Sequence, residues 1–264
     1  MKILFIGDIV GRSGREAVLA ELENLKYKED IDFCIANGEN ASGGLGMSRR
    51  AYEELKSAGI DYFTMGNHTF SKPDAGHLLS EGENICRPAN YTDFCPGEGY
   101  AIVTDSKGRK IAVMNLMGTV YNDISLTNPF LAADKSRARA GAPSSAPSGE
   151  KPTFTLLDFH AEATSEKIAM GQYLDSRVSA VVGTHTHVQT ADAMILPGKT
   201  AYITDVGMTG PQASVLGMKS EIAIKRFLTG EKVRYEQSRN KAVIHAVIIE
   251  IADETGNALS IKAI

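Results

Sequence analysis

The first 65 residues alternate short apolar runs with amphipathic stretches, and this order limits the fold more than any other feature of the chain. Three runs predict buried strands: "KILFI" at 2–6, "DFCIA" at 32–36 and "DYFTM" at 61–65. Between them, residues 17–28 and "RRAYEELKSAG" at 49–59 have helical periodicity, and Ser48 and Gly59 fit the two ends of the second helix. A β-α-β-α-β order requires right-handed crossovers, so we expect an α/β fold with a largely parallel sheet.

The rest of the chain adds a hairpin and further strands. Residues 100–118 predict two strands around a Ser-Lys-Gly turn. Further strands are expected at 154–159, 179–183 and 242–251, and helices at 163–174 and near 221–228. The segment "GAPSSAPSGEK" at 141–151 is rich in Gly, Pro and Ser and predicts a mobile surface loop. No repeat and no linker divides the sequence, so we expect one domain spanning residues 1–264.

Composition excludes some classes of partner. The 264 residues carry a net charge of −4, which gives no general attraction for nucleic acid or for an anionic membrane. Phosphate chemistry would therefore need a local positive charge, such as a bound metal ion. No apolar run approaches the roughly 20 residues that span a bilayer, and Asp8 interrupts the apolar start, unlike a signal peptide. We expect a cytoplasmic protein without a membrane partner, whose Cys34, Cys86 and Cys95 are reduced thiols.

Polar side chains follow five of the expected strands at their C-terminal ends. They are Asp8, Glu39, Asn40, Asn67, His68, His160, His185 and His187. In open α/β sheets, ligands bind at this edge. Single residues also have structural explanations, since Asp8 is compatible with a helix N-cap and Asn67 with a turn. Four of the six histidines fall at this edge together with the carboxylates, and this combination favours a metal site.

The set of ligands is too large for one ion and argues for two. A carboxylate can bridge two cations, as in two-metal hydrolytic sites. Oxygen and imidazole ligands without thiolate suit iron, manganese or zinc better than calcium. In "THTH", His185 and His187 are alternate residues, so in an extended segment both would face the metals.

Six segments carry a resemblance to a known family. They are "GDIVGRSGR" at 7–15, "NGENASGG" at 37–44, "GNHTF" at 66–70, "DFHAEATSEK" at 158–167, "GTHTHVQTAD" at 183–192 and "YITDVGMTGP" at 202–211. They resemble the calcineurin-like metallophosphoesterases and, more narrowly, the bacterial YmdB family of 2′,3′-cyclic-nucleotide 2′-phosphodiesterases. The resemblance runs nearly end to end and implies a four-layer αββα sandwich with a dinuclear centre. Residues 135–151 are longer than the family pattern at that place.

The resemblance also implies a role for each candidate residue. The first metal site would comprise Asp8, Asn40 and His187, and the second Asn67, His160 and His185, with Glu39 bridging both and His68 as the proton donor. In the broader superfamily the first strand ends in Asp-x-His and the bridging residue is Asp. Here the sequence has Asp8-Ile9-Val10 and Glu39, and Asn40 would take the place of the missing histidine. These departures match the narrower family.

The expected reaction follows from these roles. Two divalent or mixed-valence ions, Fe or Mn with Zn also compatible, would activate a water and neutralise the phosphate oxygens. His68 would protonate the leaving oxygen, an assistance worth about 10²–10⁴-fold, so that a 2′,3′-cyclic nucleotide yields a 3′-phosphate. An alternative stays open: a regulatory or RNA-linked protein with a weakly active or structural metal site. The expected partner is a small phosphodiester. RNA is left open as a partner, although the sequence predicts no basic patch for it, and a homo-oligomer is also left open.

Overall fold

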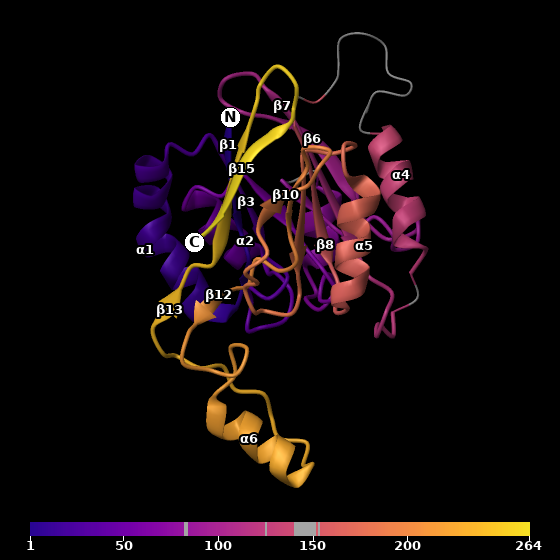
Figure 1. Cartoon of the computed structure of the whole chain (residues 1–264). Coiled ribbons are helices and arrows are strands. Elements are labelled where there is room, and N and C mark those ends of the chain that lie inside the picture. Colours follow the sequence, from indigo (N-terminus) through magenta and orange to yellow (C-terminus); the bar gives the residue numbers. More distant parts are fainter. Residues whose placement is uncertain (82–83, 125, 140–151, 153) are drawn as a thin grey trace.

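The computed structural model describes residues 1–81, 84–124, 126–139, 152 and 154–264. Two six-stranded sheets stack face to face, and helices cover the outer face of each, which gives the predicted four layers (Figure 1). The first sheet has the order β15 (Ala258–Ala263), β14 (Ala246–Ile251), β1 (Lys2–Ile6), β3 (Phe33–Asn37), β4 (Tyr62–Thr64) and β5 (Ile85–Cys86). The second has the order β10 (Met194–Ile195), β11 (Ala201–Ile203), β9 (Ala180–Thr184), β8 (Phe154–His160), β7 (Lys110–Met117) and β6 (Tyr100–Thr104).

The helices and a small third sheet complete the described part of the chain. Helices α1 (Gly11–Glu29), α2 (Arg49–Ser57) and α3 (Ala75–Ser80) pack on the first sheet, and α4 (Pro129–Arg139) and α5 (Thr164–Leu174) pack on the second. The third sheet has the order β13 (Ala242–Val243), β12 (Met208–Pro211) and β2 (Asp8–Ile9). Helix α6 (Ser220–Thr229) lies away from the sandwich (Figure 1).

Side-chain alternation explains why the central strands are apolar along their whole length. In β1, Leu4 points to the core under the helices, whereas Ile3 and Phe5 point to the core between the sheets. In β8, Leu156 faces the first sheet and Leu157 faces α5. A strand buried on both faces must be apolar at successive positions, which matches the continuous runs in the sequence.

Parallel pairing brings the carboxyl ends of the strands together. Strands β1, β3, β4 and β5 run parallel, as do β7, β8, β9 and β11. The antiparallel strands β14 and β15 extend the first sheet beyond β1. The predicted parallel sheet is therefore confirmed, and the strand ends of both sheets supply the residues described below.

Three elements differ from the sequence expectations. Helix α1 begins at Gly11 instead of residue 17; Gly14 lies against Thr209 O, and a helical turn containing two glycines shows no apolar periodicity. Helix α4 was not predicted, and residues 135–139, interpreted as part of an inserted loop, form its last turns. The expected strand at 242–251 is interrupted at Ile244 and His245, where the chain passes from the third sheet to the first. The loop expected at 141–151 lies outside the described residues.

The β6–β7 hairpin is confirmed, and its turn is linked to the first sheet through Asp32. Lys107 Nζ lies 2.6 Å and Arg109 Nη2 2.9 Å from Asp32 Oδ1, and the backbone N–H of Lys2 donates to Asp32 Oδ2 at 2.8 Å. Burial alone would raise the pKa of Asp32, but the hydrogen bonds from Lys107 and Lys2 and the Arg109 guanidinium lower it to about 2. This carboxylate therefore stabilises the folded state in its charged form.

Three further expectations concern the thiols, membrane-spanning helices and the domain. Cys34, Cys86 and Cys95 are free, and burial raises the pKa of the first two. In the part of the chain that the structure describes, no helix has both the length and the apolar character needed to cross a membrane. The single domain spanning residues 1–264 stays a prediction.

Candidate metal centre

All eight candidate side chains lie at strand ends and meet at one place. Asp8 begins β2 directly after β1, and Glu39 and Asn40 follow β3. Asn67 and His68 come after β4. His160 is the last residue of β8, and His185 and His187 follow β9. Asp8, Glu39, Asn40 and His160 are at most 2% exposed, so the centre is buried on its protein side.

A first group consists of Asp8, Asn40 and His187. Nδ2 of Asn40 lies 3.2 Å from Nε2 of His187 and 3.5 Å from Oδ1 of Asp8. His187 Nε2 lies 3.7 Å from Asp8 Oδ1. Because an amide flip exchanges Oδ1 and Nδ2 without moving the side chain, Asn40 can present oxygen to a cation at this point.

A second group consists of Asn67, His160 and His185. Nε2 of His160 lies 2.9 Å from Asn67 Oδ1 and 3.0 Å from His185 Nδ1. The other nitrogen of His185, Nε2, lies 3.0 Å from Glu162 Oε2. Glu162 was not among the predicted residues, and it holds the His185 ring with Nδ1 turned toward the centre.

Glu39 lies between the two groups. Its Oε1 atom is 3.0 Å from Asn40 Nδ2 in the first group and 3.2 Å from His160 Nε2 in the second. A carboxylate that touches both groups has the placement that a bridging ligand needs. Glu39, His160 and His185 also form a cluster whose potential ligand atoms lie within 4.8 Å of one another.

The charges of this centre depend on one another. Although burial alone would raise the pKa of Asp8, the hydrogen bond and charge of His187 lower it. Burial likewise opposes ionisation of Glu39, but the charge of His160 holds the pKa of Glu39 well below its usual range. Burial would lower the pKa of His160, and the charge of Glu39 raises it to about 9. Burial and the neighbouring His160 lower the pKa of His185 to about 4. Asp8 and Glu39 are therefore held as charged carboxylates, and the charge of His160 disfavours protonation of His185.

The residues present fit a divalent cation. Within the described part of the chain, the ion-pair partners of Asp8 and Glu39 are histidines, with no lysine or arginine among them. Nδ1 of His187 is buried without a hydrogen-bond partner in the same part of the chain. Two buried carboxylates surrounded by amides and imidazoles form a donor set typical of Mn, Fe or Zn.

A chain of hydrogen bonds behind His160 determines which of its ring nitrogens faces the centre. Thr184 Oγ1 donates to Asp158 Oδ1 at 2.7 Å, so the contact at 2.8 Å between Thr184 Oγ1 and His160 Nδ1 is donated by the imidazole. This leaves His160 Nε2 pointing to the centre, an orientation commonly fixed by such partners in metal sites. Burial raises the pKa of Asp158 to about 6. Sequence reasoning missed Asp158, although a carboxylate inside the apolar run "FTLLDFH" was a signal.

The segment between the two histidines is not extended, so that prediction is wrong. His185 has φ of 101° and His187 has φ of 64°, both in the left-handed region. Thr186 between them donates from N and Oγ1 to Asp205 Oδ2 at 3.0 and 2.7 Å, and Lys167 Nζ donates to the same oxygen at 2.7 Å. This buried ion pair holds the backbone conformation that directs both histidines to the centre. Asp205 ends "YITD" and follows the same strand-end pattern, which could have found it.

His68 lies beside the centre with its side chain 31% exposed. Its Nδ1 atom is 2.9 Å from Asn40 Oδ1 and 3.3 Å from Glu39 Oε1, and its backbone N–H donates to Glu39 Oε2 at 2.9 Å. The ring is thus held at one nitrogen and accessible from outside, as a group that exchanges a proton with a substrate must be.

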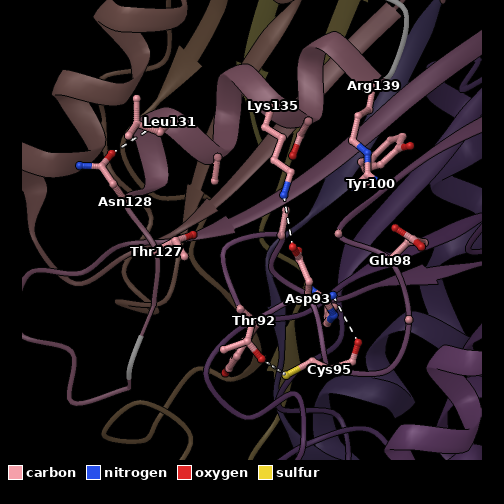
Figure 2. A pocket seen from close by; sticks show the side chains of 17 residues that line it. Thr92, Asp93, Cys95, Glu98, Tyr100, Thr127, Asn128, Leu131, Lys135 and Arg139 are labelled. Carbon is pink, nitrogen blue, oxygen red and sulfur yellow. Dashed lines mark hydrogen bonds and ion pairs between the residues drawn. The ribbon is translucent and has the colours of Figure 1, made fainter.

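Two cavities differ in their relation to this centre. One of about 240 Å³ is lined by Asn67, His160 and His185 and by the segment that follows β7. Another of about 670 Å³ lies beside α4, and among the described residues its lining includes none of the eight candidates (Figure 2). Charged groups there engage one another: Lys135 Nζ is 3.5 Å from Asp93 and Arg139 lies over a tyrosine ring. The smaller cavity is the one that adjoins the chemistry.

Stacked sheets with a centre of this composition at their strand ends are the architecture of the calcineurin-like metallophosphoesterases, whose members use divalent metal ions. A family model described as YmdB-like protein matches residues 4–264, and the chain belongs to that family. The 2′,3′-cyclic-nucleotide 2′-phosphodiesterase of Bacillus subtilis is 46% identical over 264 residues, which cover 100% of this chain and 96% of that protein.

Two solved structures agree with this assignment. A hypothetical protein from Thermus thermophilus has a TM-score of 0.90 and 39% identity, and the match covers 100% of this chain and 98% of that one. A novel phosphatase from Mycoplasma pneumoniae has a TM-score of 0.90 and 36% identity, with coverage of 100% and 92%.

Proposed function

We propose that this chain is a metal-dependent phosphodiesterase that hydrolyses 2′,3′-cyclic nucleotides to 3′-phosphates. The observation that carries the proposal is the position of Glu39, a buried carboxylate within 3.2 Å of polar atoms in two separate groups of potential ligands. The 46% identity to a cyclic-nucleotide phosphodiesterase over the whole chain supports the substrate class.

The proposal assigns two metal ions to each chain. Asp8, Asn40 and His187 would hold one ion, Asn67, His160 and His185 the other, and Glu39 would contact both. Fe or Mn suits these oxygen and nitrogen donors, and Zn is also compatible. When bound, the ions would neutralise the phosphate oxygens and lower the pKa of the attacking water.

His68 would supply the proton that the leaving group needs. Water adds its oxygen to phosphorus as the bond to the ribose 2′ oxygen breaks, and the 2′ oxygen takes a proton from His68. The proton lost by the water passes to solvent, and solvent reprotonates His68 for the next turnover. The contact from Nδ1 of His68 to Asn40 orients the ring and leaves Nε2 for the substrate. The products are a 2′-hydroxyl and a 3′-phosphate, so one water is consumed for each bond broken.

A regulatory or RNA-linked protein with a weakly active site is the alternative. The partly exposed ring of His68 beside the centre favours an enzyme, because a purely structural metal site has no need of an accessible proton donor. A small phosphodiester fits the cavity of about 240 Å³ better than a folded RNA does. A cytoplasmic location and a homo-oligomeric state are kept as expectations.

The test uses purified protein stripped of metal with a chelator and reloaded with Mn²⁺, Fe²⁺ or Zn²⁺. We expect hydrolysis of bis-p-nitrophenyl phosphate and of 2′,3′-cyclic AMP to return with Mn²⁺ or Fe²⁺, with 3′-AMP as the product and two ions per chain. Absence of hydrolysis with all three metals would overturn the proposal. Release of 2′-AMP would contradict the assigned direction of cleavage.

A further inference from the structure

Residues 118–124, the segment that follows β7, form one wall of the cavity beside the candidate metal centre. Gly118, Tyr121 and Asn122 line this cavity on one side, and His160 and His185 line it on the other. The backbone N–H of Gly118 donates to the carbonyl of His160 at 3.0 Å, which ties the segment directly to a candidate ligand. A group bound at the centre would therefore extend toward this segment.

Side chains of the protein itself hold residues 118–122 through hydrogen bonds. Glu166 of α5, 8% exposed, accepts from the N–H of Thr119 at 2.9 Å, from its hydroxyl at 3.1 Å and from the N–H of Val120 at 3.2 Å. On the other side of the turn, Asn122 Nδ2 donates to Gly118 O at 3.0 Å. These bonds hold the backbone on both sides of Tyr121.

Tyr121 combines a strained backbone with an exposed ring. Its φ of 58° is in the left-handed region, which costs a residue with a side chain about 1 kcal/mol or more. Its side chain is 87% exposed, so burial of the ring does not offset this strain. A residue that is held in an unfavourable conformation and presents an aromatic ring beside a reaction centre is expected to serve binding.

We propose that Tyr121 is the platform on which the nucleobase of the substrate stacks while its cyclic phosphate lies at the metal centre. The inference rests on the proposed function and specifies its substrate class: a cyclic phosphodiester that carries an aromatic base. Stacking on a tyrosine ring tolerates all four bases, because each has a π-face. The enzyme should therefore prefer nucleoside 2′,3′-cyclic phosphates over cyclic phosphodiesters without a base, and it should discriminate weakly among bases.

The experiment compares two substrates with the same five-membered cyclic phosphodiester. One is 2′,3′-cyclic AMP, and the other is glycerol 1,2-cyclic phosphate, which has no base. Tyr121→Ala is expected to lower kcat/KM for cyclic AMP about tenfold through KM, and to leave the glycerol ester within about twofold. Tyr121→Phe keeps the ring and should keep the activity. Tyr27→Ala, which removes a ring that is 88% exposed in α1, is the matched control and should change neither substrate.

Binding of 3′-AMP, measured by calorimetry, separates this inference from the proposed function. The dissociation constant should rise about tenfold in Tyr121→Ala and stay near the wild-type value in Tyr121→Phe. Equal losses on both substrates, or an unchanged dissociation constant, would overturn the role of Tyr121 and leave the phosphodiesterase proposal standing. If the wild type cleaves neither cyclic ester, the proposed function fails, and the calorimetry alone decides whether Tyr121 binds the base.

Discussion

Replacing Asp205 by Asn is expected to separate the stability of the fold from the binding of metal. Asp205 Oδ2 accepts from Lys167 Nζ and from the N–H and hydroxyl of Thr186, and Oδ1 accepts from Gly207 N at 2.8 Å. In either orientation, an amide would turn its NH₂ group toward one of these donors. Asp205→Asn therefore leaves a buried cation without a counter-charge and releases the segment between the two histidines.

The size of the effect follows from burial. The side chains of Lys167 and Asp205 are 1% and 0% exposed, so water screens this pair little. Removing one partner of such a pair costs about 3–5 kcal/mol. In a protein of this size each kcal/mol lowers Tm by about 2–4 °C, so we expect a decrease of about 6–20 °C. Replacing both partners, with Lys167→Met added, removes the unpaired charge and should restore at least half of the loss.

The assay follows thermal unfolding of the metal-free protein by circular dichroism, and Mn²⁺ affinity by calorimetry. The double variant should regain stability but not metal affinity, because Thr186 still lacks its charged acceptor. Lys219→Met is the matched control: it breaks an ion pair with Glu236 whose side chains are 41% and 53% exposed, and it should cost less than about 1 kcal/mol. The reasoning fails if Asp205→Asn shifts Tm no more than this control, or if the double variant binds Mn²⁺ normally.

Three further predictions address charge, bridging and proton transfer. Because the folded pKa of Asp32 is about 2 against an ordinary 3.8, its stabilisation is present above pH 4 and is lost as the pH falls toward 2. Asp32→Asn should cost about 1–2 kcal/mol at pH 7, and the free energy of unfolding measured in urea should fall less between pH 4 and 2 than in the wild type. Glu39→Gln should fold normally yet lose nearly all activity and at least one ion by elemental analysis. Glu98→Gln, at an exposed residue that lines the other cavity, is the control and should lose neither. Two ions with normal turnover in Glu39→Gln would refute the bridging role. His68→Ala should keep both ions and lose about 10²–10⁴-fold in kcat on 2′,3′-cyclic AMP but far less on bis-p-nitrophenyl phosphate, since nitrophenolate leaves without a proton; equal losses would contradict the proton-donor role.

The sequence was sufficient where an element has a local pattern of its own. The strands at Lys2–Ile6 and Phe33–Asn37 were predicted because they are buried on both faces, and Ser48 caps α2 by accepting from Ala51 N as its position suggested. Helix α4 was not predicted because its mostly polar residues 135–139 continue into a sequence rich in Pro and Ser. The composition of the whole stretch outweighed the helical pattern. Composition averaged over a window conceals a helix end.

The candidate centre was predictable because parallel strands deliver their last residues to one edge. That rule located all eight side chains, but it could not give the conformation of the segment around His185 and His187, which a distant ion pair fixes. Lys167 belongs to the predicted helix at 163–174, and nothing in the sequence shows that its charge is buried. Residues that act through tertiary contacts, such as Asp158 and Asp205, become visible once the sheets are stacked.

The candidate ligands are divided between the two sheets, so the site is complete only where the two sheets are stacked. All the carboxylate and amide ligands, Asp8, Glu39, Asn40 and Asn67, follow strands of the first sheet, and all the imidazoles, His160, His185 and His187, follow strands of the second. Of these seven candidate ligands, the first sheet supplies the oxygen donors and the second sheet the nitrogen donors. Asp158 of the second sheet accepts hydrogen bonds from Asn37 and Thr64 of the first at 2.9 and 2.6 Å, directly behind the centre. These buried bonds join the sheets directly behind the candidate ligands, so the spacing of the two donor sets depends on how the sheets pack.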